Sequence, residues 1–183
     1  MIVPLVLGGV VLFAVLRKRS GDADTAKADD APEVPVTTWR TEWGTPNEWD
    51  KRNPEARIDK PLAVDWSQYE PTFAAKVKAA FADMESQGFD PYVFEGPRTQ
   101  QRQAYLYGQG RPEFPTYGRA GNKVTWTLSA SKHGAYPCRA VDVISRSKAW
   151  GNPAFFVAWG KAAKAQGLRW LGDIGDMPHV ELA

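Results

Sequence analysis

The sequence predicts an α+β domain with a small antiparallel sheet flanked by helices, preceded by an N-terminal membrane helix. Three observations lead to this prediction: an apolar run opens the chain, helical and strand-like hydrophobic patterns follow in alternation, and Gly or Pro residues separate them. With 183 residues the chain is long enough for one compact domain with appendages. Cys138 is the only cysteine, which excludes an intrachain disulfide.

The first 19 residues are predicted to form a membrane anchor. Residues 2–16 are apolar and Arg17, Lys18 and Arg19 follow at once. A helix of this length reaches only ~22 Å, short of the ~30 Å hydrocarbon core, although snorkelling basic side chains extend it. The alternative is a cleavable signal peptide, which normally carries positive charge before the apolar run. The anchor predicts a location in a bacterial inner membrane or a virion membrane. The basic flank favours the cytoplasmic face, but the orientation of a first helix can be overruled, so the side stays open.

Two segments without a clear hydrophobic period follow the anchor. Residues 20–38 are rich in Ala, Asp and Pro and lack large aromatic residues, so they are predicted to be a flexible linker. Residues 39–64 form a Trp- and Pro-rich arm that contains Trp39, Trp43 and Trp49. Two interpretations of this arm stay open: an irregular segment packed on the domain, or a surface that binds glycan or a partner protein.

The predicted domain spans residues 65–183. Its first half begins with a helix between Pro71 and Gly88, where apolar residues recur at helical spacing. Residues 92–94 are predicted to be a buried strand. After the Gly-Pro turn, residues 99–107 have a helical pattern, and residues 111–122, rich in Gly and Pro, are predicted to be a loop.

The second half supplies a strand at residues 140–143 and a helix that ends near Gly167. Asn152 is the predicted N-cap of that helix and Pro153 its first residue. Residues 168–171 and 179–182 are predicted to be two short strands around a tight turn. This order of elements favours an α+β domain with a small antiparallel sheet.

The chain has only two histidines, and each lies in a segment that also contains a carboxylate. Two imidazoles and one carboxylate are a common set of ligands for catalytic zinc, which leaves one position open for water. His133, Asp142 and His179 are the candidate ligands, and Asp176 is the candidate general base. The alternative is that both histidines are ordinary surface or core residues. A net charge of +2 with interspersed signs gives no support to nucleic-acid binding.

Four blocks of the sequence resemble the family of zinc D-alanyl-D-alanine carboxypeptidases, dipeptidases and phage L-alanyl-D-glutamate endopeptidases. The blocks are Glu95 to Tyr107, Ser131-Lys132-His133, Arg139-Ala140-Val141-Asp142 and Asp176-Met177-Pro178-His179. They lie in the order that the family shows, across about residues 65–183. The resemblance implies Zn²⁺ held by His133, Asp142 and His179, with Asp176 as base. It also implies that Arg98 steadies the substrate carbonyl or the oxyanion, and that Ser131 and Gln103 contact substrate.

The sequence departs from the family pattern in two places. Asp142 follows His133 by nine residues rather than the commoner seven, and Cys138 stands where a Gly or another small residue is expected. Cys138 is either a small buried residue or a thiolate that joins or competes for the metal. If the loop is misaligned, Asp142 is the first assignment to fail. The second departure is a short connection, residues 170–175, before Asp176.

The resemblance implies a peptidase that hydrolyses peptide bonds of the peptidoglycan stem, in the manner of a phage endolysin. The loop after Gly110 favours cleavage of the L-Ala to D-Glu bond. A D-Ala-D-Ala carboxypeptidase is the alternative within the same class. A membrane-anchored structural or binding component of a virion or lysis system, without turnover, is the alternative from another class. The expected partners are the peptidoglycan stem peptide and, through residues 2–16, a membrane.

Overall fold

The computed structural model describes residues 39–129 and 132–183, which belong to one compact unit. The predicted membrane anchor, the predicted linker and Ser131 lie outside these residues. Within the described residues, no helix is both long and apolar enough to cross a membrane.

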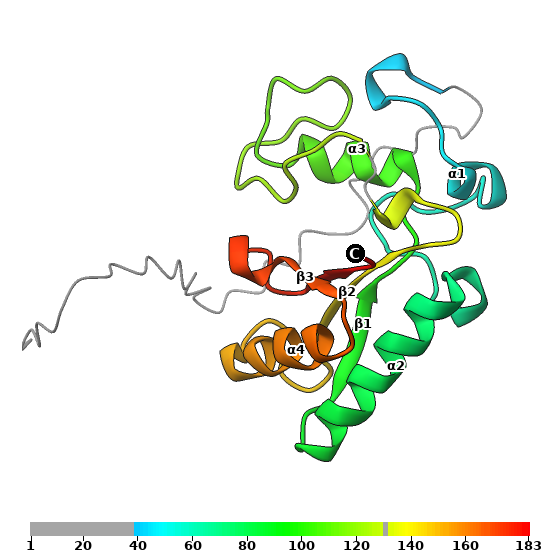
Figure 1. The fold of residues 1–183 in the computed structure, drawn as a ribbon. Coiled ribbons are helices and arrows are strands. Elements are labelled where there is room, and N and C mark those ends of the chain that lie inside the picture. Colours follow the sequence, from blue (N-terminus) through cyan, green and yellow to red (C-terminus); the bar gives the residue numbers. More distant parts are fainter. Residues whose placement is uncertain (1–38, 130–131) are drawn as a thin grey trace, which may run out of the picture. The chain divides into compact units, whose positions relative to one another are not determined.

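A four-stranded antiparallel sheet forms the centre of the domain (Figure 1). Its strands are β1 (Pro91–Glu95), β2 (Ala140–Ser145), β3 (Arg169–Trp170) and β4 (His179–Glu181), in the order β1-β2-β4-β3. Every neighbouring pair is antiparallel. The predicted α+β class with a small antiparallel sheet is therefore confirmed.

Two amphipathic helices pack together and against the sheet. In α2 (Pro71–Ser86) the side chain of Glu70 caps the N-terminus, and in α4 (Pro153–Ala165) Asn152 does so, as predicted. Both helices contact strands of the sheet, and Figure 1 shows them on the same side of it. Their buried residues join those of the strands in one core, which includes Phe73, Val77, Met84, Phe155, Trp159, Val141, Val143 and Val180.

A third helix, α3 (Gln100–Gly108), begins directly after β1 and is capped by the side chain of Thr99. It packs against the Trp-rich arm. A smaller core of Trp43, Ala104 and Tyr117 lies between α3 and the arm, with the rings of Trp43 and Tyr117 stacked at 5.3 Å. The arm is thus part of the folded domain and supports α3.

The arm contains more regular structure than its sequence predicts. It forms a 3-10 turn, η2 (Thr41–Trp43), and a short helix, α1 (Glu48–Arg52). Asn47 and Asp50 make a capping box, in which each side chain accepts a hydrogen bond from the backbone of the other. Trp43 and Trp49 are 2% and 1% exposed. These two residues therefore fit the interpretation of an arm packed on the domain.

Three further 3-10 turns are η3 (Trp66–Gln68), η4 (Lys132–Gly134) and η5 (Leu171–Ile174). The prediction of a tight turn between the last two strands is wrong, because η5 and Gly175, with a φ of 97°, extend the connection between β3 and β4. The Trp170 ring occupies the space beside this connection, and its indole nitrogen donates to Met177 O. Residues 111–122 contain no helix or strand, as predicted.

Candidate metal centre

Strand pairing brings two of the three predicted ligands together. Val141 and Val143 of β2 face the core beneath α2 and α4, so Asp142 between them faces the opposite side of the sheet. His179 of β4 is the cross-strand partner of Asp142, and Glu95 of β1 is its partner on the other side. Directly opposed residues of antiparallel strands share a face. The sheet therefore presents a row of Glu95, Asp142 and His179.

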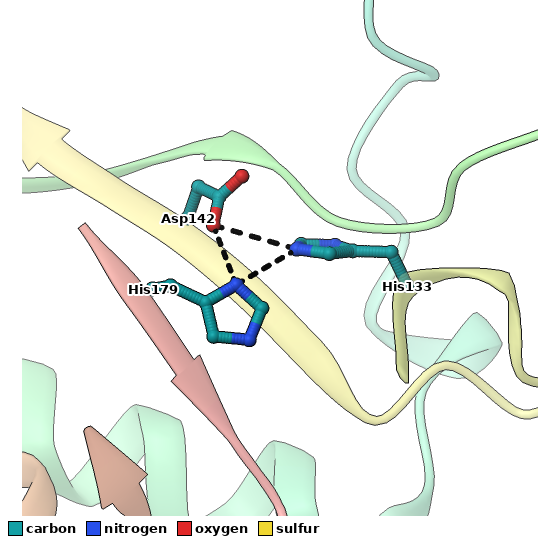
Figure 2. A group of neighbouring side chains, drawn as sticks. All are labelled: His133, Asp142 and His179. Carbon is teal, nitrogen blue, oxygen red and sulfur yellow. Dashed lines mark hydrogen bonds and ion pairs between the residues drawn. The ribbon is translucent and has the colours of Figure 1, made fainter. Parts of the chain in front are cut away.

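The third predicted ligand comes from a different segment, η4, and completes a triangle (Figure 2). His133 Nε2 lies 3.4 Å from Asp142 Oδ1 and 3.2 Å from His179 Nδ1, and the last two atoms are 3.0 Å apart. His133 is 1% exposed and His179 5% exposed. The three predicted ligands thus form a buried cluster whose atoms can hold a metal ion.

The cluster fits a tetrahedral zinc ion by its donor types and by its spacing. Imidazole nitrogens and a carboxylate oxygen bind Zn²⁺ at about 2.0–2.2 Å, which separates ligand atoms by roughly 3.3–3.6 Å in a tetrahedron. The three observed separations, 3.0 to 3.4 Å, are close to that range. Small movements of the side chains are sufficient to admit the ion.

Each histidine makes a hydrogen bond through the ring nitrogen that faces away from the cluster. His133 Nδ1 lies 2.7 Å from Gly96 O, and His179 Nε2 lies 3.2 Å from Glu181 Oε2. A backbone carbonyl only accepts, so His133 Nδ1 donates and the Nε2 lone pair is left for a metal. A Cβ at Gly96 would collide with the Tyr69 hydroxyl, so glycine is required at this turn.

Glu181 is a site residue that the sequence prediction missed. It lies two residues after His179 on β4 and therefore on the same face of the sheet. Burial alone would lower the pKa of His179, but hydrogen bonds to Asp142 and Glu181 raise that pKa to about 9. The same negative surroundings favour a metal cation, which displaces that proton when it binds.

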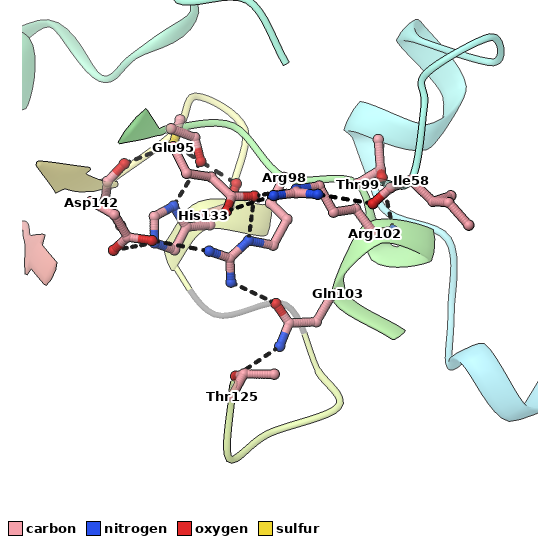
Figure 3. A network of polar contacts seen from close by, with 12 residues as sticks. Ile58, Glu95, Arg98, Thr99, Arg102, Gln103, Thr125, His133 and Asp142 are labelled. Carbon is pink, nitrogen blue, oxygen red and sulfur yellow. Dashed lines mark hydrogen bonds and ion pairs between the residues drawn. The ribbon is translucent and has the colours of Figure 1, made fainter. Parts of the chain in front are cut away.

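Arg98 lies at the centre of a buried polar network next to Asp142 (Figure 3). Its guanidinium donates to Glu95 Oε1 at 2.9 Å, to Gln103 Oε1 at 2.8 Å and to Asp142 Oδ2 at 3.1 Å. Arg102 donates to both oxygens of Glu95, at 2.6 and 3.2 Å. Arg98 therefore holds the carboxylate oxygen of Asp142 that does not face the two histidines.

The electrostatics keep Asp142 ionised. Burial would raise the pKa of its carboxyl group, but His133, His179 and Arg98 lower that pKa well below its usual value. The predicted contact of Arg98 with substrate stays a prediction, and so does that of Gln103, because the contacts described are with the protein. Gln103 Nε2 donates to Thr127 O at 2.6 Å.

Asp176, the predicted base, lies just before β4, in the turn that leads to His179. The residue as a whole is exposed. Partial desolvation of the carboxyl group, followed by the negative charge of Asp142, raises its pKa, while His179, His133 and Arg98 oppose that rise. The backbone oxygen of Asp176 accepts a hydrogen bond from His179 N at 3.3 Å, and the charges of these four groups act on its carboxyl group. A raised pKa makes it a better proton acceptor near neutral pH.

Two tryptophans hold the segment between Asp176 and His179. Trp170 Nε1 donates to Met177 O at 2.8 Å, and Trp159 Nε1 donates to Pro178 O at 2.9 Å. Trp159 is fully buried on α4, so it ties this segment to the helical layer. These contacts could not be predicted from the sequence, because an indole's hydrogen-bond partner depends on tertiary structure.

The longer loop between His133 and Asp142 is fixed by backbone hydrogen bonds and does not displace Asp142. Cys138 N donates to Gln68 O, and Glu70 N donates to Cys138 O, both at 2.9 Å. Cys138 is fully buried, and its Sγ lies 3.3 Å from Ala140 O. Burial raises the pKa of the thiol to about 12. Among the described residues, the metal cluster does not include Cys138. This fits the first interpretation, in which Cys138 is a small buried residue.

We expect Cys138→Ser to leave the metal content unchanged, because the thiol is outside the cluster. In the native protein at pH 8 the thiol is also expected to resist a thiol-specific reagent, since it is buried and protonated, and to react once the chain is unfolded. Metal analysis and labelling followed by mass spectrometry measure the two effects. Rapid labelling of the native protein would contradict this account.

We expect Glu181→Gln to weaken the binding of a divalent metal ion by about 10- to 100-fold, the range for residues that orient a metal-ligating histidine. The amide keeps the shape of the carboxylate but loses the charge next to His179. Competition with a chelator measures the affinity. Glu85→Gln on the exposed face of α2 is the control. Equal affinities in the two variants would show that Glu181 does not support the ligand.

No protein-family model matches the sequence, and no curated protein matches it significantly. The assignment of a function therefore depends on the residues and geometry of the cluster itself.

Proposed function

We propose that this protein is a zinc-dependent peptidase that hydrolyses peptide bonds of the bacterial peptidoglycan stem. The observation that carries the proposal is the buried triangle of His133 Nε2, Asp142 Oδ1 and His179 Nδ1, with Asp176 in the turn directly before His179. A structural domain has no need of a base next to three converging ligands. The resemblance of the four sequence blocks to zinc peptidases of the cell wall supplies the substrate class.

The ligand assignment follows from the cluster. His133, Asp142 and His179 would hold the ion, Gly96 O and Glu181 would orient the two imidazoles, and Arg98 would orient Asp142. When bound, zinc lowers the pKa of a coordinated water toward ~7 and polarises the scissile carbonyl.

Asp176 carries the proton in this proposal. It accepts one proton from the attacking water as the new C–O bond forms, and it returns that proton to the amine nitrogen as the C–N bond breaks. The immediate products are one carboxylic acid and one amine, which exchange a proton to give a carboxylate and an ammonium group, so atoms and charges balance. Arg98 offsets part of the negative charge near the reacting carbonyl, in addition to its contact with Asp142. Ser131 contacts substrate, as the resemblance implies, whereas Gln103, which is buried and paired with Arg98, would act on substrate through that arginine.

The bond cleaved is, in our proposal, that between L-Ala and D-Glu. Digestion of purified peptidoglycan followed by mass spectrometry tests this directly. Release of peptides that begin with D-Glu is expected. Release of free D-Ala alone would identify a carboxypeptidase instead, and an unchanged polymer with zinc-loaded protein would contradict the proposed function.

The proposed location is a membrane, through the predicted anchor at residues 2–16, which lies outside the described residues. A reporter fused to the C-terminus distinguishes the two sides. A signal from a reporter that works only outside the cytoplasm places the peptidase domain on the wall side.

A further inference from the structure

One loop next to the metal centre presents a large aromatic side chain to solvent. We call residues 123–128 the Trp126 loop. Trp126 is 80% exposed and Val124 is 61% exposed. Tryptophan is highly buried on average, and Trp126 is the most exposed of the large hydrophobic side chains that the structure describes.

Buried side chains hold the loop on both sides of Trp126. Gln103, which is 1% exposed, donates to Thr127 O at 2.6 Å and to Thr125 Oγ1 at 3.2 Å. Arg111, which is 7% exposed, donates to Thr125 O at 3.0 Å. Buried polar groups are stable only when they are paired, and the loop backbone supplies these partners. The loop is thus held in one position, while its central side chain contributes little to the core.

The same glutamine connects the loop to the candidate metal centre. Its Oε1 accepts from Arg98, whose guanidinium also donates to Asp142. Figure 3 shows this series, with Gln103 between Arg98 and Thr125. Two side chains therefore separate the Trp126 loop from a predicted metal ligand, and the loop has a fixed position at the edge of the site.

We propose that Trp126 binds a sugar ring of the peptidoglycan glycan strand, next to the peptide bond that is cut. This inference rests on the proposed function. The L-Ala residue of the stem is attached directly to a sugar, so a bond between L-Ala and D-Glu lies one residue from the glycan. A pyranose ring offers a flat C–H face that suits an indole, whereas the small side chain of Ala does not. Lys123 Nζ, 5.7 Å from the Trp126 ring, adds a positive charge that suits the carboxylate of D-Glu.

Two substrates of different composition test the proposal. Trp126→Ala and wild type are compared on intact peptidoglycan and on a synthetic L-Ala-D-Glu stem peptide without sugar. We expect kcat/KM on the polymer to fall by about 3- to 10-fold through KM, with no change on the peptide. Val157→Ala, an exposed apolar residue of α4 on the helical side of the sheet, is the control.

Binding is measured separately from cleavage. In an Asp176→Asn background, adding Trp126→Ala is expected to reduce co-sedimentation with peptidoglycan by a similar factor. An equal loss on both substrates would show that Trp126 contacts the peptide, and no loss on either would show that it contacts nothing. Both results overturn the inference. If wild type cleaves neither substrate, the proposed function fails, and the co-sedimentation assay still decides whether Trp126 binds glycan.

Discussion

Asp176→Asn is expected to lower kcat by about 10²- to 10⁴-fold, the usual contribution of a positioned general base, while zinc content stays at the wild-type level. The amide has nearly the same size as the carboxylate but does not accept a proton. Asp176 is not one of the three converging ligands, so the metal is retained. Hydrolysis of peptidoglycan and metal analysis on the same preparation measure both quantities.

The matched control for this variant is Asp173→Asn. Asp173 lies three residues earlier, on η5, and pairs with the exposed Lys164 at 2.6 Å. Its replacement is expected to leave kcat within about twofold, because exposed ion pairs contribute little. If Asp176→Asn were as active as this control, another group would have to be the base. If it lost its zinc, Asp176 would belong to the metal ligands.

Glu95→Gln is expected to lower the free energy of unfolding by about 3–5 kcal/mol, the cost of removing one partner from a buried ionic network. Glu95 is 2% exposed and accepts hydrogen bonds from both Arg98 and Arg102. Burial would raise its pKa, but the charge of Arg98 and the hydrogen bond and charge of Arg102 lower that pKa. Without the carboxylate, two guanidinium groups are left with too little negative charge around them.

Chemical denaturation measures this loss, and Glu85→Gln on the exposed face of α2 is again the control. The loss of Glu95 is also expected to weaken zinc binding, because Arg98 orients Asp142. A change in stability below about 1 kcal/mol would show that the network does not depend on Glu95. A large loss of stability with unchanged zinc affinity would show that the network stabilises the fold but does not support metal binding.

Local signals predicted the helices and strands well. Asn152-Pro153 marks the start of α4, and the apolar spacing after Pro71 marks α2. The arm was less predictable, because α1 has only one turn of regular structure and depends on the capping box of Asn47 and Asp50. The prediction of a tight turn before His179 is wrong, because the 3-10 turn η5 and Gly175 lengthen the connection between β3 and β4.

The predicted ligands come together as the sequence suggested, despite the longer loop after His133. The residues that orient them were harder to predict. Glu181 could have been predicted from strand periodicity, because it lies two residues after a ligand on the same strand. The sequence could not predict the contacts of Gly96 O or of the Trp159 and Trp170 indoles, since these contacts join segments that only the fold brings together.

The zinc content of the purified full-length chain, measured beside that of His133→Ala, tests the central claim most directly. About one zinc ion per chain is expected for a single three-ligand site with one open position, with loss of zinc in the variant because one of the three ligands is missing. Denaturation of both metal-free proteins shows whether the variant still folds. Equal zinc in both proteins, or no zinc in the folded wild type, would contradict the metal centre and favour a structural or binding module.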